Sequence, residues 1–335
     1  MASRWIPPDQ PMLEPGFFLA SLPKGWEPRV VTVSNGYQVV GILYARERVI
    51  KGIRSGVVYV DGSLGDTVLS DPPHHKNVLR VAAETLLASK IYGIRIRVRR
   101  GSREIDAIRG LIASRPLDFH YSRIRTYNDC PFWRYDAHLT LGDSYEQFLT
   151  ALGSTTRHNF RYYRRVFERA GHSLIENPSM DEFRSATIEL AAKSKFQPPQ
   201  SVTERHLNMV AATRRPLIYG LKHRNGEWVS VIGGWPVPGG AVLLFQHNND
   251  RDFGKDSLSV VLRGYYIESL IRQGLKELVI MDGTGPPLSR YAKNRSTLVF
   301  HLDAPTWRWR TARFLISRIG PRLPAPLAEA ALTVA

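Results

Sequence analysis

The residues best suited to chemistry lie in one strand–loop–helix–strand segment, residues 241–282. Its loop holds Gly254, Lys255 and Ser257, and an apolar helix starts near Ser259. The first amides of a helix lack intrahelical partners and the helix dipole adds partial positive charge, so such a loop suits an anion. Gly254 permits close backbone approach, Lys255 supplies a charge, and either serine can cap the helix. We therefore predict a pyrophosphate-sized anion site in this loop. An ordinary capped loop is the alternative.

A basic helix is expected over residues 157–170. Its arginines recur at helical spacing and form a broad cationic face, whereas Phe160, Tyr163 and Phe167 form an opposite stripe that can pack. Guanidinium groups grip phosphates with paired hydrogen bonds, which makes this face a candidate anion or substrate surface. A solvated face with snorkelling side chains is the alternative. The arginines concerned are Arg157, Arg161, Arg164, Arg165 and Arg169.

Four further side chains are candidate acid–base or phosphate-binding groups. Asp282 ends a strand before a glycine turn, which is where open α/β sheets place ligands. Tyr291 and Lys293 follow and would lie over that end as proton donor and phosphate contact. His247 ends an earlier strand, where a base could deprotonate an attacking amine or hydroxyl. A structural turn carboxylate and a structural histidine are the plainer readings of Asp282 and His247.

Several chemistries are disfavoured. The sequence has no GxSxG, GxxxxGK[ST], HExxH or strand-linked GxGxxG motif, which argues against serine hydrolases, NTPases, zinc proteases and dinucleotide enzymes. Cys130 is the only cysteine, so neither an internal disulfide framework nor a cysteine-based zinc cluster can form. No metal cofactor is expected.

The 335-residue chain is strongly basic. It carries 46 lysines and arginines against 30 aspartates and glutamates, a formal charge of +16. This excess favours anionic partners such as nucleic acid, phosphorylated cofactors or anionic lipid, although solvated basic faces would account for it equally. No apolar run has the ~18–20 residues of a membrane span, and the N-terminus lacks a signal peptide's apolar core, so we expect a cytoplasmic protein.

The elements that must position these residues occur twice, in the same order. In each half, strands precede a loop and a helix, and a last strand closes the unit. This repeated order predicts a duplicated, mixed α/β fold. The expected elements are strands 38–45, 54–60 and 94–98 with helix 77–92, then strands 216–222, 228–236, 241–247 and 277–282 with helix 259–272.

Four segments follow from this pattern. An irregular lead-in is expected over residues 1–36, a first lobe over 37–150, a second lobe with the donor site over 151–304, and a basic amphipathic tail over 305–335.

The second half resembles the double-GNAT acyltransferases, the family grouped with cellulose- and exopolysaccharide-biosynthesis acetyltransferases and, more distantly, with Fem-type aminoacyl transferases. The resemblance starts with the R-x-N-hydrophobic-R helix, here Arg157, Asn159 and Arg161. A strand ending in a polar loop and a serine-containing helix start come next, at residues 245–259. The last landmarks are Asp282, Gly285, Tyr291 and Lys293.

The resemblance implies two tandem GNAT-like lobes and an acyl-CoA co-substrate bound at Gly254, Lys255, Ser257, Ser259 and Lys293. It also implies transfer to an amine or hydroxyl of a small-molecule or saccharide acceptor, by positioning and by an oxyanion-stabilising amide in the third strand. The chain departs from the family in its donor loop, which is poorer in glycine, and in having Tyr291-Ala292-Lys293 where Tyr-Lys is usual.

Two other functions stay open. A Fem-like transferase would take aminoacyl-tRNA as donor, which suits the charge and the basic helix. A non-catalytic nucleic-acid or membrane-surface module would use the mixed basic and apolar residues 307–318 for peripheral contact with anionic lipid, although a docked terminal helix explains them too. The acceptor, the acyl group and the oligomeric state are not readable from the sequence.

Overall fold

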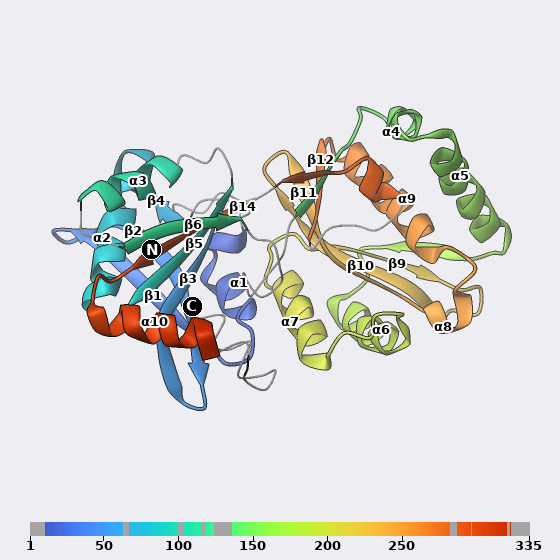
Figure 1. The fold of residues 1–335 in the computed structure, drawn as a ribbon. Coiled ribbons are helices and arrows are strands. Elements are labelled where there is room, and N and C mark those ends of the chain that lie inside the picture. The colour runs from blue at the N-terminus through green and yellow to red at the C-terminus, as the bar shows by residue number, and fades with distance from the viewer. Residues whose placement is uncertain are drawn as a thin grey trace. The chain divides into compact units, whose positions relative to one another are not determined.

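The computed structural model describes residues 11–62, 67–99, 104–114, 118–123, 136–281, 287–295, 297–319 and 322. These residues form two compact units (Figure 1). The first is built mainly from Met12–Tyr135 and Arg295–Ala335, and the second mainly from Asp136–Asn294. The second unit is therefore an insertion in the chain of the first. None of the described helices is long and apolar enough to cross a membrane.

A mixed sheet of seven strands forms the first unit, in the order β1-β2-β3-β5-β14-β6 with β4 paired to β2. The β3–β5 pair is parallel and β14 is antiparallel to both of its neighbours. The strands are β1 (Trp26–Asn35), β2 (Gln38–Ile50), β3 (Ile53–Gly62), β4 (Val68–Ser70), β5 (Gly93–Arg99), β6 (Asp118–Arg123) and β14 (Thr297–Asp303). The helices are α1 (Pro15–Ala20), α2 (His75–Ala88), α3 (Glu104–Ser114) and α10 (Trp307–Ile319).

Strand alternation divides this sheet into two covered faces. On one face Val58 and Val60 of β3 pack with Val78 and Leu79 of α2 in the main core. On the other, Val57 packs with Trp309 of α10. Because neighbouring strand residues point to opposite faces, one strand serves both cores.

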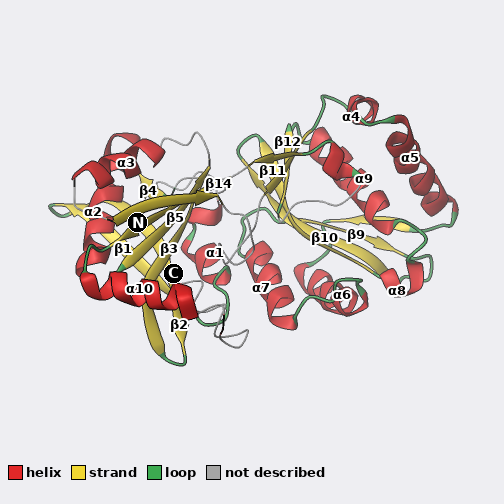
Figure 2. Ribbon diagram, in the orientation of Figure 1, coloured by secondary structure: helices red, strands yellow, loops and turns green. Residues whose placement is uncertain are grey.

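The second unit also has a seven-stranded mixed sheet, in the order β13-β7-β12-β11-β10-β9-β8. Figure 2 shows its strands in yellow and its helices in red. Its strands are β7 (Asp136–Thr140), β8 (Ser173–Glu176), β9 (Leu217–Lys222), β10 (Trp228–Val237), β11 (Gly240–Asn248), β12 (Glu277–Ile280) and β13 (Lys293–Arg295). Its helices are α4 (Tyr145–Ala151), α5 (Ser154–Arg169), α6 (Met180–Lys193), α7 (Gln200–Ala211), α8 (Asp250–Phe253) and α9 (Leu258–Arg272).

Helices cover both faces of this sheet as well. α9 packs on β9, β10 and β11, and α5 packs on α9, so the two form successive layers over one face. α6 and α7 cover the opposite face (Figure 1). The apolar stripe expected on the basic helix is confirmed at Phe160 and Phe167, which are buried in the core, and Tyr163 packs against that core.

The two sheets exchange strands. β6 belongs to the first sheet and the next strand, β7, to the second; β13 belongs to the second sheet and the next strand, β14, to the first. In both sheets the exchanged strand lies between the second strand of the parallel pair and a short edge strand. The repeat expected from the sequence is therefore present, but each repeat is completed by a strand from the other half.

The expected fold class, two lobes each with a mixed sheet flanked by helices, is confirmed. Three boundaries differ. The lead-in is not irregular, because residues 15–20 form α1 and 26–35 form β1. The units divide after Tyr135 and Asn294, where the exchanged strands cross, instead of near 150 and 304. Most described residues of the expected tail form α10, which belongs to the first unit.

Candidate donor and acid–base site

A β-bulge interrupts β11 in the centre of the second sheet. Gly233 of β10 lies opposite Phe245 and Gly234 opposite Leu243, which leaves Leu244 as an extra residue on β11. A bulge bends its strand and shifts the direction of the residues that follow. Close packing holds it in place, since a Cβ on Gly234 would lie 1.8 Å from the carbonyl oxygen of Val242.

Within the described residues, the pairing between the parallel strands β11 and β12 ends beside this bulge. Pairing runs only from Gly240 with Glu277 to Leu243 with Ile280, and the Met281 amide donates to the Leu243 carbonyl oxygen at 3.0 Å. Beyond Leu243, no described residue of β12 pairs with the remaining part of β11. Within the described residues, the edge of β11 that follows the bulge therefore has no strand partner on the β12 side.

The first unit differs at the equivalent place. Its parallel pair continues from Val57 with Gly93 to Gly62 with Val98, at the end of β3. Within the described residues, only the second unit thus has a strand, β11, that continues for several residues after its parallel pairing has ended.

After the bulge, alternate β11 residues face different helical layers. Phe245 and His247 face α6 and α7: the Phe245 ring lies 6.0 Å from that of Phe183 and 5.9 Å from that of His206. Gln246 faces α9, since its amide donates to the Ser259 carbonyl oxygen at 3.4 Å. The end of β11 therefore places His247 on one face of the sheet and a polar contact to the predicted anion loop on the other.

The loop between β11 and α9 contains a short helix that the sequence did not predict, α8. The Asn249 side chain caps it by accepting the Asp252 amide at 3.1 Å. Gly254 ends it with ordinary helical φ. Ser257 precedes α9 in the left-handed region, at φ 48°, and its side chain makes no capping bond. The predicted serine cap is therefore absent at Ser257, and within the described residues the amides of Leu258 and Ser259 donate to no acceptor.

The charge of this loop is mixed. Lys255 is exposed. The loop has two basic residues, Lys255 and Arg251, and three acidic residues, Asp250, Asp252 and Asp256. Asp250 is engaged by the Lys195 amide at 2.9 Å, and Asp252 by the Asn249 side-chain amide at 2.8 Å. Anion affinity here would come from the free helix amides and Lys255 more than from net charge.

Beneath the start of α9, a hydrogen-bonded network joins the helix to the sheet. The Arg263 Nε donates to Gln246 Oε1 at 2.8 Å, and the Gln246 amide also reaches Asn248 at 3.2 Å. Ser230 donates to Asn248 Oδ1 at 2.6 Å. Burial lowers the pKa of the Arg263 guanidinium to about 10. The sequence did not identify Arg263 or Gln246 as site residues. The one feature that distinguishes them is that each is polar in an otherwise largely apolar element, α9 and β11 respectively.

His247 lies buried at the end of β11. Its ring stacks on Phe245 at 5.2 Å, and its Nε2 has no hydrogen-bond partner in the described structure. Burial lowers the pKa of His247 to about 4 and, with the charges of Arg205 and His247, lowers that of His206 to about 3. Both imidazoles are neutral at pH 7, so His247 offers an uncharged group for hydrogen bonding or proton transfer.

Tyr291 lies at the start of α5. Its phenol oxygen accepts the Gly153 amide at 2.8 Å and is 3.4 Å from Thr156 Oγ1. The hydrogen bonds with Thr156 and Gly153 lower the pKa of Tyr291. Tyr291 thus binds the backbone amide of Gly153, the N-cap residue of the basic helix, a contact that its position in the sequence did not predict.

Besides Tyr291, the closing segment predicted from the sequence contains Asp282, Gly285 and Lys293. Asp282 and Gly285 lie outside the described residues. Lys293 is exposed on edge strand β13, three strands from β11 in the sheet order. Within the described structure no contact joins Lys293 to the donor loop.

The basic face of α5 is partly neutralised. Arg161 pairs with Glu146, and Arg164 contacts Glu268 at 2.7 Å and Glu168 at 3.0 Å. Burial alone would lower the pKa of Arg164, but these hydrogen bonds raise it above its ordinary value. Arg157, Arg165 and Arg169 make no ion pair within the described residues. Arg157 and Arg161 line a groove of about 700 Å³ between α4, α5 and α9, whereas Asn159 is not among its lining residues.

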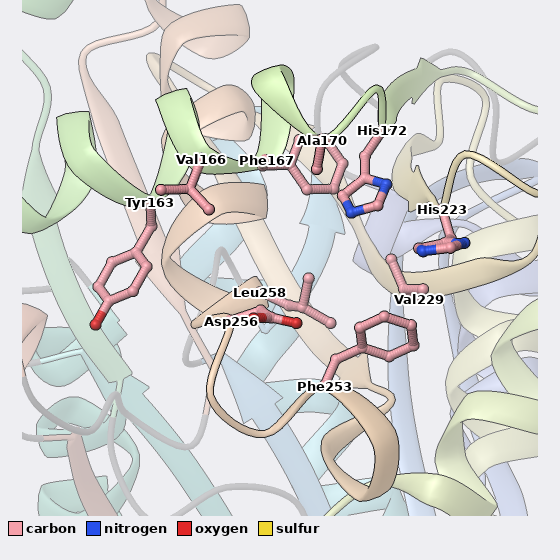
Figure 3. Close-up of a pocket in the computed structure, with 10 residues that line it drawn as sticks. All are labelled: Tyr163, Val166, Phe167, Ala170, His172, His223, Val229, Phe253, Asp256 and Leu258. Atoms are coloured by element: carbon pink, nitrogen blue, oxygen red, sulfur yellow. The ribbon is translucent and has the colours of Figure 1, made fainter.

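A smaller cavity of about 100 Å³ lies between the end of α5 and the donor loop (Figure 3). The rings of His172 and His223 lie 4.5 Å apart at its wall, and each Nδ1 accepts a backbone amide, from Arg224 and Asn225 respectively. Burial, His223 and Arg224 lower the pKa of His172. Ligand sites for molecules the size of a nucleotide are several times larger, so this cavity does not hold a whole donor. Its other lining residues are Tyr163, Val166, Phe167, Ala170, Val229, Phe253, Asp256 and Leu258.

No family model and no curated protein matches this sequence. Solved structures do match at low identity. FemX is 10% identical with a TM-score of 0.60, over 82% of this chain and 88% of its own. L-PGS from Bacillus licheniformis is 10% identical with a TM-score of 0.56, over 92% and 89%. A protein of unknown function from Bacteroides thetaiotaomicron is 12% identical with a TM-score of 0.55, over 84% and 87%. At these identities the similarity shows that most of the chain shares their fold, and the fold alone.

Proposed function

We propose that the chain is a GNAT-type acyltransferase that moves an acyl group from an acyl-CoA-like thioester to an amine or hydroxyl. One observation carries the proposal: within the described residues the pairing of β11 with β12 ends at Leu243, beside the Leu244 bulge, and β11 leads through α8 to the start of α9, where the amides of Leu258 and Ser259 have no acceptor. An open strand edge followed by an anion-accepting helix start suits a donor with an amide-containing arm and a phosphorylated end.

Different residues of the candidate site would bind the two ends of such a donor. The open edge of β11 beyond Leu243 would pair with the amides of the arm, and a backbone amide near the bulge would stabilise the developing oxyanion. The start of α9 and Lys255 would hold the phosphates. Gly254, Ser257 and Ser259 shape this end, and Lys293 is a candidate for a more distant phosphate contact.

His247 is our leading candidate for proton transfer. It follows the bulge, faces α6 and α7, and is neutral at pH 7 because burial lowers its pKa. An acceptor amine or hydroxyl that reaches the end of β11 would meet an uncharged imidazole. Asp282 is the second candidate base. We assign Tyr291 to positioning instead of general-acid chemistry, because its phenol oxygen accepts the Gly153 amide while its O–H is directed at Thr156 Oγ1.

A titration of CoA and acetyl-CoA into the whole protein, followed by calorimetry, tests the donor assignment. The informative variant is Ser259→Glu, which puts a carboxylate in the first turn of α9. Acidic residues there favour the helix but repel a phosphate, so folding should be kept while CoA affinity falls at least about tenfold. Ser201→Glu makes the same change in the first turn of α7 and should leave CoA affinity unchanged. Absence of CoA binding to the wild-type protein would refute a CoA donor.

A second candidate is the Fem-like reaction, with aminoacyl-tRNA as donor. Two observations favour it: the donor loop carries more acidic than basic residues, and Arg157, Arg165 and Arg169 project from α5 without ion pairs in the described structure. Binding to tRNA that weakens steeply with salt and is reduced by Arg165→Gln and Arg169→Gln together would support it. Tight CoA binding with no tRNA binding would eliminate it.

A further inference from the structure

Helix α10 carries apolar side chains on two opposite sides, and one side docks it to the first unit. Trp309 is buried against Val57, stacks on Tyr92 at 5.7 Å, and donates its indole N–H to Asp303 Oδ1 at 3.0 Å. Asp303 also pairs with Arg313. These contacts fix which side of α10 faces the protein.

The other side remains apolar although it faces solvent. Trp307, Phe314, Leu315 and Ile319 expose 70%, 59%, 49% and 51% of their surface. Trp307, Phe314 and Leu315 recur at positions i, i+7 and i+8, which share a helix face opposite Trp309 and Ile316. Docking to the first unit does not require this stripe.

Arginines flank the exposed stripe. The Arg308 guanidinium lies 5.6 Å from the Trp307 ring, and that of Arg318 lies 5.4 Å from the Phe314 ring. The sequence of α10 contains four arginines and no acidic residue. Aromatic rings beside arginines suit a membrane interface, where the ring enters the headgroup layer and the guanidinium meets lipid phosphates.

We propose that the outer side of α10 is a docking surface for an anionic membrane. The helix would lie flat, with Trp307, Phe314 and Leu315 in the interface and Arg308 and Arg318 against anionic headgroups, while Trp309 keeps it anchored to the first unit. Charge complementarity selects this occupant: a second copy of the chain would bring an equally basic helix to the same surface. The inference does not depend on acyl transfer.

Vesicle flotation of the full-length protein tests this surface. The protein should bind phosphatidylcholine vesicles containing phosphatidylglycerol, bind phosphatidylcholine alone weakly, and lose binding as salt rises. Phe314→Ser with Leu315→Ser should lower partitioning at least about tenfold, because the apolar contact is lost. Arg308→Gln with Arg318→Gln should lower it by about fivefold for each arginine.

Matched variants separate the surface from general effects. Phe196→Ser removes an aromatic ring that is 87% exposed in the second unit, and Arg80→Gln with Arg109→Gln removes the same charge from α2 and α3. None of these should change partitioning by more than about twofold. Equal binding by the α10 variants and wild type, binding independent of anionic lipid, or a concentration-dependent dimer abolished by the α10 variants would each overturn the proposal.

Discussion

The phenol oxygen of Tyr291 accepts the amide hydrogen of Gly153, the N-cap residue of α5, at 2.8 Å. A residue near the end of the second unit therefore holds the start of a helix that lies near the beginning of that unit. Tyr291→Phe should lower Tm by a few degrees, because the Gly153 amide loses its acceptor. Differential scanning calorimetry measures this. If Tyr291 is instead a general acid, Tyr291→Phe should abolish the basic limb of the pH–rate profile with little change in Tm.

His247 should make stability depend on pH. Its folded pKa of about 4 lies below the ordinary value of 6.5, so protons bind the unfolded chain preferentially between these values. Stability is therefore complete above about pH 6.5 and falls as the pH drops towards 4, by roughly 3 kcal/mol for a shift of this size. His247→Gln should reduce the dependence in urea titrations and leave the part that His206 contributes, whereas His158→Gln on exposed α5 should leave it unchanged. An unchanged slope in His247→Gln would contradict the burial of this imidazole.

Asp303 should be essential for folding of the first unit. It is buried between Arg95, at 2.9 Å, Arg313 and the Trp309 indole. Asp303→Asn leaves buried guanidinium charge uncompensated and should cost about 3–5 kcal/mol in urea unfolding. Asp106→Asn breaks an exposed pair with Arg109 and should cost less than about 0.5 kcal/mol. Similar values for the two variants would contradict this role of Asp303.

The bulge in β11 should be intolerant of a side chain at Gly234. A Cβ there would lie 1.8 Å from the Val242 carbonyl oxygen, so Gly234→Ala should destabilise the protein by more than about 2 kcal/mol. Gly16→Ala meets no atom within 4 Å and should be neutral or slightly stabilising. A Gly234→Ala protein with wild-type stability would show that β11 and β10 are not packed as described.

Local patterns predicted most elements of the fold. The helix expected over 259–272 is α9, Leu258–Arg272, and the strand expected over 241–247 is β11, Gly240–Asn248. Apolar periodicity reports which residues are buried locally, which is sufficient for such elements. The strand exchange was not predictable in the same way, because β7 and β14 pair with strands that lie far away in the sequence.

The candidate site was predictable only in part. The loop before α9 was recognised from Gly254, Lys255 and Ser259, because close backbone approach, positive charge and helix capping can each be predicted from the residue type alone. The bulge at Leu244 depends on pairing with β10, and no residue type marks it. The cap formed by Tyr291 joins residues 138 positions apart. Such features follow from tertiary contacts, which a single sequence does not reveal.

Amide hydrogen exchange with and without CoA tests most directly whether the second unit binds its donor at the separated strands. If CoA binds along β11, its addition should slow exchange in residues 244–248 of β11 and at Leu258 and Ser259, with no change in β3 and β5 of the first unit. Protection confined to the first unit or to the α5 surface, or no protection at saturating CoA, would contradict it.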